Sequence, residues 1–514
     1  MRASAIPFSS INWVKAVKTL SKLARLALLL SSVLYFFSYP EVDPDLWGHL
    51  FFGKEILQRG TLPPHNLYSY TAPDHAWINH EWLAEVILYG VYHFFGSGGL
   101  ILFKMALGGV LVFLLDLTLR RSVSSLWVRA LALVWTMAIL SPGFNIRPQI
   151  FTYVLFTGLL VLFYRREEKE SKALFVAPFF MGLWVNLHGG FVAGVGAISL
   201  FLLWTVIGGL RRRNRRAALM TEVVIPLMLS GLVLVLNPYG LQLLTFVGGD
   251  VLVRRPITEW EPIPLLDFSF LEFKLGLIWV LLATPWKGSW RRWDFVLTLL
   301  AALLALGHQR HTPLFAIAAA PFLAMGLQRV FPFVQKRMSE WLLATAVGGM
   351  ALYQISAIGG VHLQNRFQLI VSPREYPTQA AEFLTRNGVH GNLAVPFEWG
   401  EYLIWKLYPE VRVSVDGRYT TAYPFEVIED NFEWMRGGEN WRRLLDIYPT
   451  DIAVTNRYHP VTALLRKDPE WVYIYSDPIA FIFVRNVPAQ AGFLQKFKEK
   501  RLLPPEPPSL YFPG

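Results

Sequence analysis

The sequence predicts a mainly α-helical membrane protein of about eleven spans with an extracytoplasmic C-terminal α/β domain. Hydrophobic residues make up 54% of the 514 residues and charged residues only 17%, whereas a soluble domain usually carries about 25% charge. The apolar residues gather in runs long enough to cross a bilayer. After residue 360 the pattern changes to short strands alternating with helices, which is typical of an α/β domain.

The positive charge of the chain is explained by membrane orientation. Lys and Arg number 48 against 37 Asp and Glu, giving a formal net charge of +11. These basic residues crowd the ends of apolar segments, as membrane orientation requires, so nucleic-acid binding is not expected. The chain has no Cys, which excludes disulfides, thiolate metal sites and a Cys nucleophile.

The first expected span follows a basic N-terminus and lacks the small-residue cleavage pattern of a signal peptide, so we expect it to stay uncleaved. The eleven expected spans are 21–39, 98–119, 126–142, 148–164, 173–187, 190–209, 221–237, 272–286, 293–308, 312–328 and 340–359.

Basic clusters fall in alternate connections between these spans. They lie at 120–129, 165–172, 211–216, 287–292 and 329–337. Basic connections stay in the cytoplasm. One orientation therefore puts the N-terminus inside and the C-terminal domain outside.

The expected domains are a membrane domain over 1–359, an α/β domain over 360–500 and a Pro-rich tail over 501–514, extended or disordered. The α/β domain carries strand patterns at 392–397, 411–415, 451–455, 471–475 and 479–484. Helical patterns lie at 377–386, 400–407, 425–448 and 461–466.

The first outer loop, 40–97, carries two amphipathic helices at 46–59 and 81–95. Such helices lie in the membrane interface, so we expect their aromatic residues to be interfacial anchors. These are Trp47, Phe51, Phe52, Trp82 and Tyr89.

Polar residues on the outer side form seven compact clusters, whereas the inner connections carry mostly Arg and Lys. Ionisable residues at span edges are functional candidates by default, so we expect these clusters to line one outward-facing cavity. The clusters are 41–45, 79–82, 145–149, 186–190, 237–240, 258–261 and 308–311.

Asp43 and Asp45 are the candidate catalytic residues. In an extended segment, residues i and i+2 point the same way, and a carboxylate near an apolar boundary has a raised pKa that suits a general base. For Asp45 the alternative is an N-cap of the helix that starts at Leu46. That alternative explains Asp43 less well.

Cations and polar residues of the other outer clusters are candidate substrate contacts. Arg147, Arg254, Arg255 and Arg310 either hold a phosphate or only extend to the membrane surface. His188 and Tyr239 lie in Gly-containing stretches whose first interpretation is a turn, with a substrate contact as the alternative. The remaining candidates are His49, His80, Glu81, Glu259, His308 and His311.

No cofactor is firmly implied by these residues. A divalent cation is an open alternative at His49, His65, His75 and His80, but their spacing matches no standard metal motif, so no metal ligands are assigned. The tail stretches 398–402 and 416–419 favour turns, since Asp-Gly is a common turn pair. Walker A, GxGxxG and GxSxG motifs are absent from the sequence.

Several stretches together carry a family resemblance that spans most of the chain. They are DPDLWGHL (43–50), YSYT (68–71), HEWL (80–83), RPQ (147–149), NLHGG (186–190), NPYG (237–240), TEW (258–260), WGEYL (399–403) and DGR (416–418). The chain resembles the GT-C superfamily of polyprenyl-phosphate-sugar-dependent membrane glycosyltransferases, in a bacterial group of uncertain substrate. The resemblance implies a location in the bacterial cytoplasmic (inner) membrane and a role in the cell envelope.

The resemblance also implies a mechanism. Asp43 or Asp45 would take a proton from an unknown glycan, lipid or protein acceptor, which attacks the sugar, and polyprenyl phosphate would leave with its charge held by an Arg or Lys. The adjacent Asp-Glu pair of protein mannosyltransferases is missing, which leaves the choice between the two Asp residues open. The WWD-type motif of oligosaccharyltransferases is also missing, so glycosylation of peptide Asn is not expected.

Two other functions compete with a glycosyltransferase. A protein with this fold but no activity would serve as a partner or scaffold in envelope polysaccharide or exported-protein assembly. A secondary transporter or flippase would carry acidic or broken-helix features at the bilayer midplane, but Asp116 lies near the inner end of its span. Asp43 and Asp45 in a cavity with a basic site would favour the enzyme; the same residues facing water or only capping helices would favour the scaffold.

Overall fold

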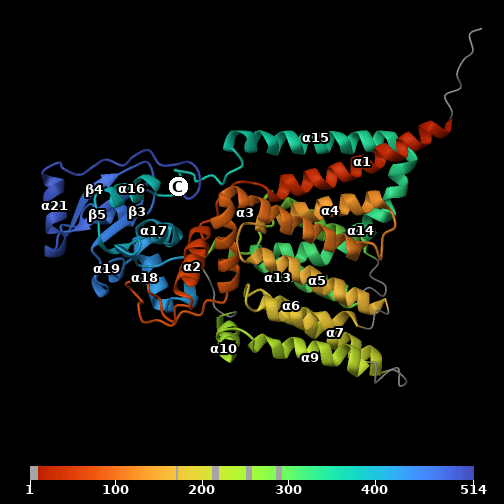
Figure 1. Cartoon of the computed structure of the whole chain (residues 1–514), viewed down its shortest axis with the longest axis horizontal. Helices are drawn as coiled ribbons and strands as arrows, with labels where there is room; N and C mark the ends of the chain where they lie inside the picture. The colour runs from red at the N-terminus through yellow and green to blue at the C-terminus, as the bar shows by residue number, and fades with distance from the viewer. Residues whose placement is uncertain (1–9, 169–171, 211–218, 251–256, 285–291) are drawn as a thin grey trace, which may run out of the picture.

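The protein consists of a helical bundle with an α/β domain at one end (Figure 1). The computed structural model describes residues 10–168, 172–210, 219–250, 257–284 and 292–514. The bundle helices are α1 (Ser10–Phe37), α3 (Trp82–Leu119), α4 (Leu126–Leu140), α5 (Gln149–Glu167), α6 (Ala177–Trp184), α7 (Phe191–Leu210), α9 (Ile225–Leu232), α10 (Leu241–Asp250), α11 (Leu271–Ala283), α13 (Trp293–Gly307), α14 (Thr312–Arg337) and α15 (Glu340–Asn365).

Each of the eleven expected spans contains a helix in the described part of the chain. Six helices there are long and apolar enough to cross a membrane, judged by length and composition: Lys15–Phe37, Trp82–Leu119, Leu126–Gly143, Phe191–Gly208, Gln309–Val334 and Glu340–Asn365. Shorter apolar helices occur at Ala173–Trp184, Met220–Val235 and Trp293–Gly307. The chain is therefore a multi-pass membrane protein, as its hydropathy predicts. Helix α10 was not predicted.

Helix α3 is bent at Gly96, whose φ of 64° and ψ of −164° are not helical. A positive φ favours glycine, which has no Cβ to clash with the backbone. The bend separates the predicted helix 81–95 from the predicted span 98–119. The first half of α3 can therefore lie against the α/β domain while the second half runs through the bundle (Figure 1).

The basic ends of several helices meet at the end of the bundle away from the α/β domain. Arg121, just after α3, pairs with Glu167 at the end of α5 at 2.9 Å. Arg166 pairs with Glu222 at 3.0 Å, and the indole of Trp293 donates to Glu167. The described parts of these basic connections therefore lie together. This is expected because every second connection of a multi-span protein lies on the same side of the membrane.

The C-terminal domain is built on a five-stranded sheet of order β2-β1-β3-β5-β4. Strand β1 is parallel to β2 and β3, and β5 is antiparallel to β3 and β4. All five predicted strands are present: β1 (Gly391–Ala394), β2 (Val411–Val413), β3 (Ile452–Asn456), β4 (Trp471–Ser476) and β5 (Ala480–Arg485).

The helices of this domain also follow the sequence pattern, apart from α21 (Ala491–Lys498), which was not predicted. The predicted helix over 425–448 is two helices, because Gly437 adopts a φ of 61° and ends the first. The helices are α16 (Thr378–Arg386), α17 (Gly400–Leu407), α18 (Phe425–Arg436), α19 (Arg443–Ile447), α20 (Val461–Leu465) and α21 (Ala491–Lys498).

Helix α2 (Leu46–Arg59) packs against α17 of the α/β domain. Trp47, Phe51 and Phe52 are buried in one core with residues of the α/β domain. The Trp47 ring lies 4.9 Å from that of Tyr402, and Phe51 lies 5.7 Å from Tyr408. The expectation that these three aromatics are interfacial anchors is therefore wrong, because the α/β domain covers them.

The Pro-rich tail is extended and returns to the start of the first outer loop. The indole of Trp47 donates to the carbonyl of Pro513 at 2.9 Å, and the Phe512 side chain is buried. Val371 donates its backbone N–H to Leu510. Of the two states expected for the tail, the extended one is observed.

Candidate functional site

A cavity of about 900 Å³ lies where the bundle meets the α/β domain; we call it the main cavity. Of the fourteen predicted site residues, eleven line it: Asp43, Asp45, His49, His80, Glu81, Arg147, His188, Glu259, His308, Arg310 and His311. Tyr239 does not line the cavity, and its hydroxyl accepts the backbone N–H of Asn79 at 2.9 Å. Arg254 and Arg255 lie outside the described residues.

Arg147 joins three carboxylates at the polar end of the cavity. Its Nε lies 2.8 Å from Asp43 Oδ1, its Nη1 lies 2.5 Å from Glu259 Oε1, and its Nη2 pairs with Asp45 Oδ2. Glu259 belongs to the short 3-10 helix η6 (Thr258–Trp260). The guanidinium is thus enclosed by protein carboxylates, and a phosphate would have to displace one of them.

The side chain of Asp45 makes no capping hydrogen bond, although Asp45 occupies the N-cap position of α2. It turns to Arg147 instead, so the expected alternative of a simple N-cap is not what the side chain does. The backbone N–H of Asp45 donates to Asp43 Oδ1 at 3.1 Å, which holds the two carboxyl groups in one tight turn.

Asp43 is the more buried of the two, with 7% of its side chain exposed against 25% for Asp45. Burial raises the pKa of Asp43, and the charge of Arg147 offsets only part of this effect. Its Oδ2 accepts one long hydrogen bond from Asn145, at 3.3 Å. A carboxylate oxygen with spare acceptor capacity and a raised pKa has the properties of a general base.

Glu81 lies between two histidines. Its Oε1 is 3.7 Å from His80 Nε2 and 3.5 Å from His188 Nε2. Burial would raise the pKa of Glu81, but the charges of His80, His49 and Arg310 hold it below its usual value. His188 accepts the backbone N–H of Gly190 on Nδ1, so a neutral ring carries its proton on Nε2, facing Glu81. Burial lowers the pKa of His188 to about 3.

His49 and Glu85 form a second buried pair. His49 Nδ1 lies 3.7 Å from Glu85 Oε1, and the Asn79 amide donates to the other Glu85 oxygen at 2.6 Å. Burial would lower the pKa of His49, but the hydrogen bond and charge of Glu85 raise it above its usual value, together with the charge of Glu81. This pair fixes α2 to the first half of α3.

Trp260 is surrounded by the residues of the 308–311 cluster. The Arg310 guanidinium lies 4.6 Å from the centre of the Trp260 ring. The backbone carbonyl of Trp260 lies 2.7 Å from His308 Nδ1. His311 precedes α14 and its ring lies 6.2 Å from the Trp260 ring. Cationic and polar groups therefore gather at the N-terminal end of α14, an end that favours anions.

On the side of the bundle helices, the main cavity continues from this polar end as an apolar groove. Leu300 and Leu304 on α13 are about half exposed, with no charged residue between them. The groove-lining residues are Phe156, Val192, Ala193, Gly196, Ala197, Phe246, Val247, Leu297, Leu300, Ala301, Leu304 and Leu314.

The histidines considered for a metal site are not brought together. His65 and His75 do not line the main cavity with His49 and His80, and His65 Nδ1 instead contacts the carbonyl of Asp74. Within the part of the chain that the structure describes, no three His, Asp or Glu side chains group as a metal site.

Four ionisable residues of the cavity were not among the predicted site residues: Glu85, Glu398, Glu401 and Arg418. Glu85 lies on the same helix face as Glu81, four residues on, and that spacing was available in the sequence. The other three come from the α/β domain. No motif assigns a function to them, and only the docking of α17 against α2 brings Glu401 to the cavity.

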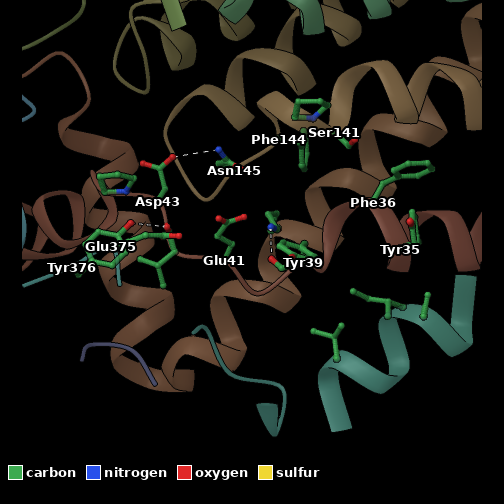
Figure 2. Close-up of a pocket in the computed structure, with 17 residues that line it drawn as sticks. Tyr35, Phe36, Tyr39, Glu41, Asp43, Ser141, Phe144, Asn145, Glu375 and Tyr376 are labelled. Atoms are coloured by element: carbon green, nitrogen blue, oxygen red, sulfur yellow. Dashed lines mark hydrogen bonds between the residues drawn. The ribbon is translucent and has the colours of Figure 1, made fainter. Parts of the chain in front are cut away.

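A second cavity, of about 850 Å³, lies on the other side of Asp43 (Figure 2). Asp43 and Pro44 line both cavities. The second cavity is bounded by α1, α15 and the 3-10 turn η1 (Ser141–Gly143), with Tyr35, Phe36, Phe144 and Ile358 among its apolar lining.

The charged lining of the second cavity is mostly acidic. Glu41, Asp43 and Glu375 face the single cation Lys104, whose Nζ donates to the carbonyl of Tyr39 at 3.0 Å. The Tyr376 hydroxyl donates to the carbonyl of Val42 at 3.0 Å, which fixes the strand beside Asp43. Three arginines and five histidines line the main cavity, whereas the lining of the second cavity includes neither residue type.

Comparison with known proteins identifies the fold. No family model matches the chain, and no curated protein sequence matches it. Among solved structures, it is similar to the archaeal oligosaccharyltransferase AglB from Archaeoglobus fulgidus, in complex with an inhibitory peptide and a dolichol-phosphate. The TM-score is 0.57 at 11% identity, over 90% of this chain and 75% of that chain. The chain therefore shares the fold of this oligosaccharyltransferase, which agrees with the fold that the family resemblance implies.

Proposed function

We propose that the protein is a membrane glycosyltransferase of the GT-C type, which transfers a sugar from a polyprenyl-phosphate donor to an acceptor outside the cytoplasm. The observation that carries the proposal is the form of the main cavity. It joins an apolar groove among membrane helices to a polar end that holds carboxylates, arginines and histidines. The donor has a matching arrangement: an apolar isoprenoid chain at one end, and a polar phosphate and sugar at the other.

The apolar groove suits the isoprenoid chain of the donor. Its walls come from α5, α7, α10, α13 and α14 and are uncharged. The solved AglB structure contains a dolichol-phosphate, which supports a lipid-phosphate donor for a chain of the same fold.

The leaving phosphate suits the cluster around Trp260. Arg310, His308 and His311 lie near the N-terminus of α14, where backbone N–H groups favour negative charge. Arg147 suits this role less well because three carboxylates already enclose it. Charge develops on the phosphate oxygen as the bond to the sugar breaks, and the fixed charge of Arg310 there stabilises the transition state.

Asp43 suits the general base because it lies between the two cavities. An acceptor hydroxyl that enters the second cavity attacks the anomeric carbon of a sugar held in the main cavity. Asp43 takes the hydroxyl proton, a new C–O bond forms, and the bond to phosphate breaks with its electron pair leaving on polyprenyl phosphate. Asp45 and Glu259 hold Arg147, and Arg147 orients Asp43.

The basic ends of the bundle helices support the proposed orientation, with the α/β domain outside the cytoplasm; the location in the bacterial inner membrane follows from the family resemblance. Arg121 and Arg166 lie at the end opposite that domain, where the positive-inside rule puts the cytoplasm. The competing scaffold function is less well supported, because Asp43 and Asp45 both line the main cavity, which also contains arginines.

A transfer assay tests the proposal. Purified protein in nanodiscs is given radiolabelled undecaprenyl-phosphate hexoses and pentoses, with membrane extract as acceptor. Label transferred to the extract, and lost in Asp43→Asn, supports the glycosyltransferase. If no donor of the panel binds or transfers, the glycosyltransferase proposal fails and the scaffold becomes the better hypothesis.

Filling the apolar groove is expected to weaken donor binding. Gly196 on α7 lines the groove, and a Cβ added there meets no atom within 4 Å, so Gly196→Leu places a larger side chain at the groove. We expect the affinity for undecaprenyl phosphate to fall by about tenfold or more, since burying a few methylene groups of lipid contributes about 0.8 kcal/mol each. Binding of radiolabelled undecaprenyl phosphate in detergent measures this.

Gly109→Leu is the matched control. Gly109 lies on membrane helix α3, also has open space at its Cβ, and lines neither cavity. Equal losses of affinity in both variants would show that the groove does not hold the lipid chain.

A further inference from the structure

Glu401 is a buried carboxyl group that the α/β domain contributes to the main cavity. It lies in the first turn of α17, is 4% exposed, and lines the cavity beside Asp45. Its Oε2 has no hydrogen-bond partner among the described residues. A buried polar atom without a partner is costly, so it calls for a functional explanation.

Two glycines make room for this carboxyl group. A Cβ at Gly48 on α2 would overlap Glu401 Oε2. A Cβ at Gly417 would lie 2.8 Å from Glu401 Oε1 and 2.7 Å from Asp45 Oδ1. The carboxyl groups of Glu401 and Asp45 therefore converge over Gly417, one from each side of the interface between the first outer loop and the α/β domain.

The charges around Glu401 favour its protonated form. The acidic groups near it are Asp45, Asp416 and Glu85, and the cations are Arg418 and Arg147. Both cations already have carboxylate partners: Arg418 pairs with Asp416, and Arg147 pairs with Asp43, Asp45 and Glu259. Burial raises the pKa of Glu401 well above its usual value, and the charge of Asp416 adds to this.

A protonated carboxyl group has one donor and spare acceptor capacity. That combination matches two neighbouring hydroxyl groups of a sugar, one accepting and one donating. We propose that Glu401, as a neutral carboxylic acid, binds ring hydroxyls of the sugar that the donor carries. The inference rests on the proposed function, and it assigns the α/β domain a part in recognising the donor sugar.

The test compares the affinity for sugar-bearing and sugar-free lipid, which needs no turnover. The probes are the undecaprenyl-phosphate hexoses and pentoses of the panel and undecaprenyl phosphate itself. Wild type is expected to bind one sugar-bearing lipid at least about tenfold more tightly than the sugar-free lipid, as one or two good hydrogen bonds allow. Glu401→Ala is expected to remove most of this preference and leave the affinity for undecaprenyl phosphate unchanged.

Glu401→Gln separates a neutral carboxyl group from an ionised one. A Gln side chain also offers a donor and an acceptor, so it is expected to restore most of the preference that Glu401→Ala removes. Glu410→Ala, at an exposed position of the same domain, is the matched control and is expected to keep the full preference.

Several results would overturn the proposal. One is an equal loss of the preference in Glu401→Gln and Glu401→Ala, because that is the behaviour of an ionised carboxylate. Another is an unchanged preference in Glu401→Ala. Failure of the proposed function is distinguishable, because wild type would then bind none of the lipids, with or without sugar.

Discussion

Asp43→Asn is expected to lower the rate of sugar transfer by about 10²–10⁴-fold, the usual contribution of a general base. The amide cannot accept a proton from the acceptor, although it keeps the size of the side chain. The affinity for undecaprenyl phosphate is expected to change little, because Asp43 lies beyond the groove and the Trp260 cluster that hold the lipid phosphate. The measurement is single-turnover transfer of radiolabel, with thermal unfolding run on the same preparations.

The pH dependence of transfer gives a second readout of Asp43. Only the deprotonated carboxylate accepts a proton, so the rate falls as the pH drops through its pKa. Because burial raises the pKa of Asp43, this decrease is expected at a higher pH than for an ordinary Asp, whose pKa is about 3.9. Asp74→Asn, at an exposed position in the same outer loop, is expected to leave both rate and profile unchanged. A folded Asp43→Asn protein with wild-type rate would exclude Asp43 as the base.

Arg418→Met is expected to destabilise the contact between the α/β domain and the first outer loop by about 3–5 kcal/mol, the range for breaking a buried ion pair. Arg418 donates to both oxygens of Asp416, at 2.8 and 2.6 Å, and to Asn66 of the outer loop at 2.7 Å. Its guanidinium also lies over the rings of Phe52 and Trp77, at 4.7 and 4.6 Å. Without Arg418, the fully buried carboxylate of Asp416 loses its charge partner. Thermal unfolding in detergent and protease accessibility of the α/β domain measure the effect.

Two comparison variants distinguish the stability lost with the ion pair from a nonspecific loss of stability caused by the substitution. Adding Asp416→Asn to Arg418→Met removes the unpaired charge, so the double variant is expected to recover part of the lost stability. Arg59→Met breaks an exposed pair with Glu55 on α2 and is expected to cost only about 0.3–0.5 kcal/mol. A loss for Arg418→Met as small as that for Arg59→Met would contradict a structural role for this pair.

The helices and strands could be predicted from the sequence because each depends on a local pattern. Apolar runs bounded by basic residues identify the spans, and the strands of the α/β domain are short apolar runs between turn residues. The two-part helix over 425–448 could not be divided in advance. The Gly437 that ends α18 is followed by Gly438 and then by residues compatible with a helix, so the pattern alone does not separate α18 from α19.

Many of the residues that line the site could also be predicted, but which of these side chains contact one another could not. Polar clusters on one side of a membrane protein favour a common cavity, and His80, Glu81 and His188 do meet there. Arg147 was expected to contact lipid surface or phosphate, since nothing in the sequence shows that Asp43, Asp45 and Glu259 converge on it. Glu401 lies in the WGEYL stretch that contributes to the family resemblance, but nothing in that stretch assigns it a role, and its position depends on the docking of α17 on α2.

The environment of α2 shows the limit of amphipathic patterns. Trp47, Phe51 and Phe52 give a helix with an apolar face, and that face packs equally well against lipid or protein. The covering side chains, such as Tyr402 and Tyr408, lie more than three hundred residues further along the chain. A local pattern therefore reports that a face is buried without identifying what buries it.

The contact between Trp47 and the tail has a consequence for biosynthesis. The hydrogen bond from Trp47 to Pro513 joins residues 466 positions apart. At ribosomal rates of about 5–20 residues per second, Pro513 emerges about 20–90 s after Trp47. During that interval the aromatic face of α2 lacks the part of its cover that Phe512 and Pro513 supply. A chain released before Pro513 is made therefore lacks the hydrogen-bond partner of the Trp47 indole, although α17 already covers the helix.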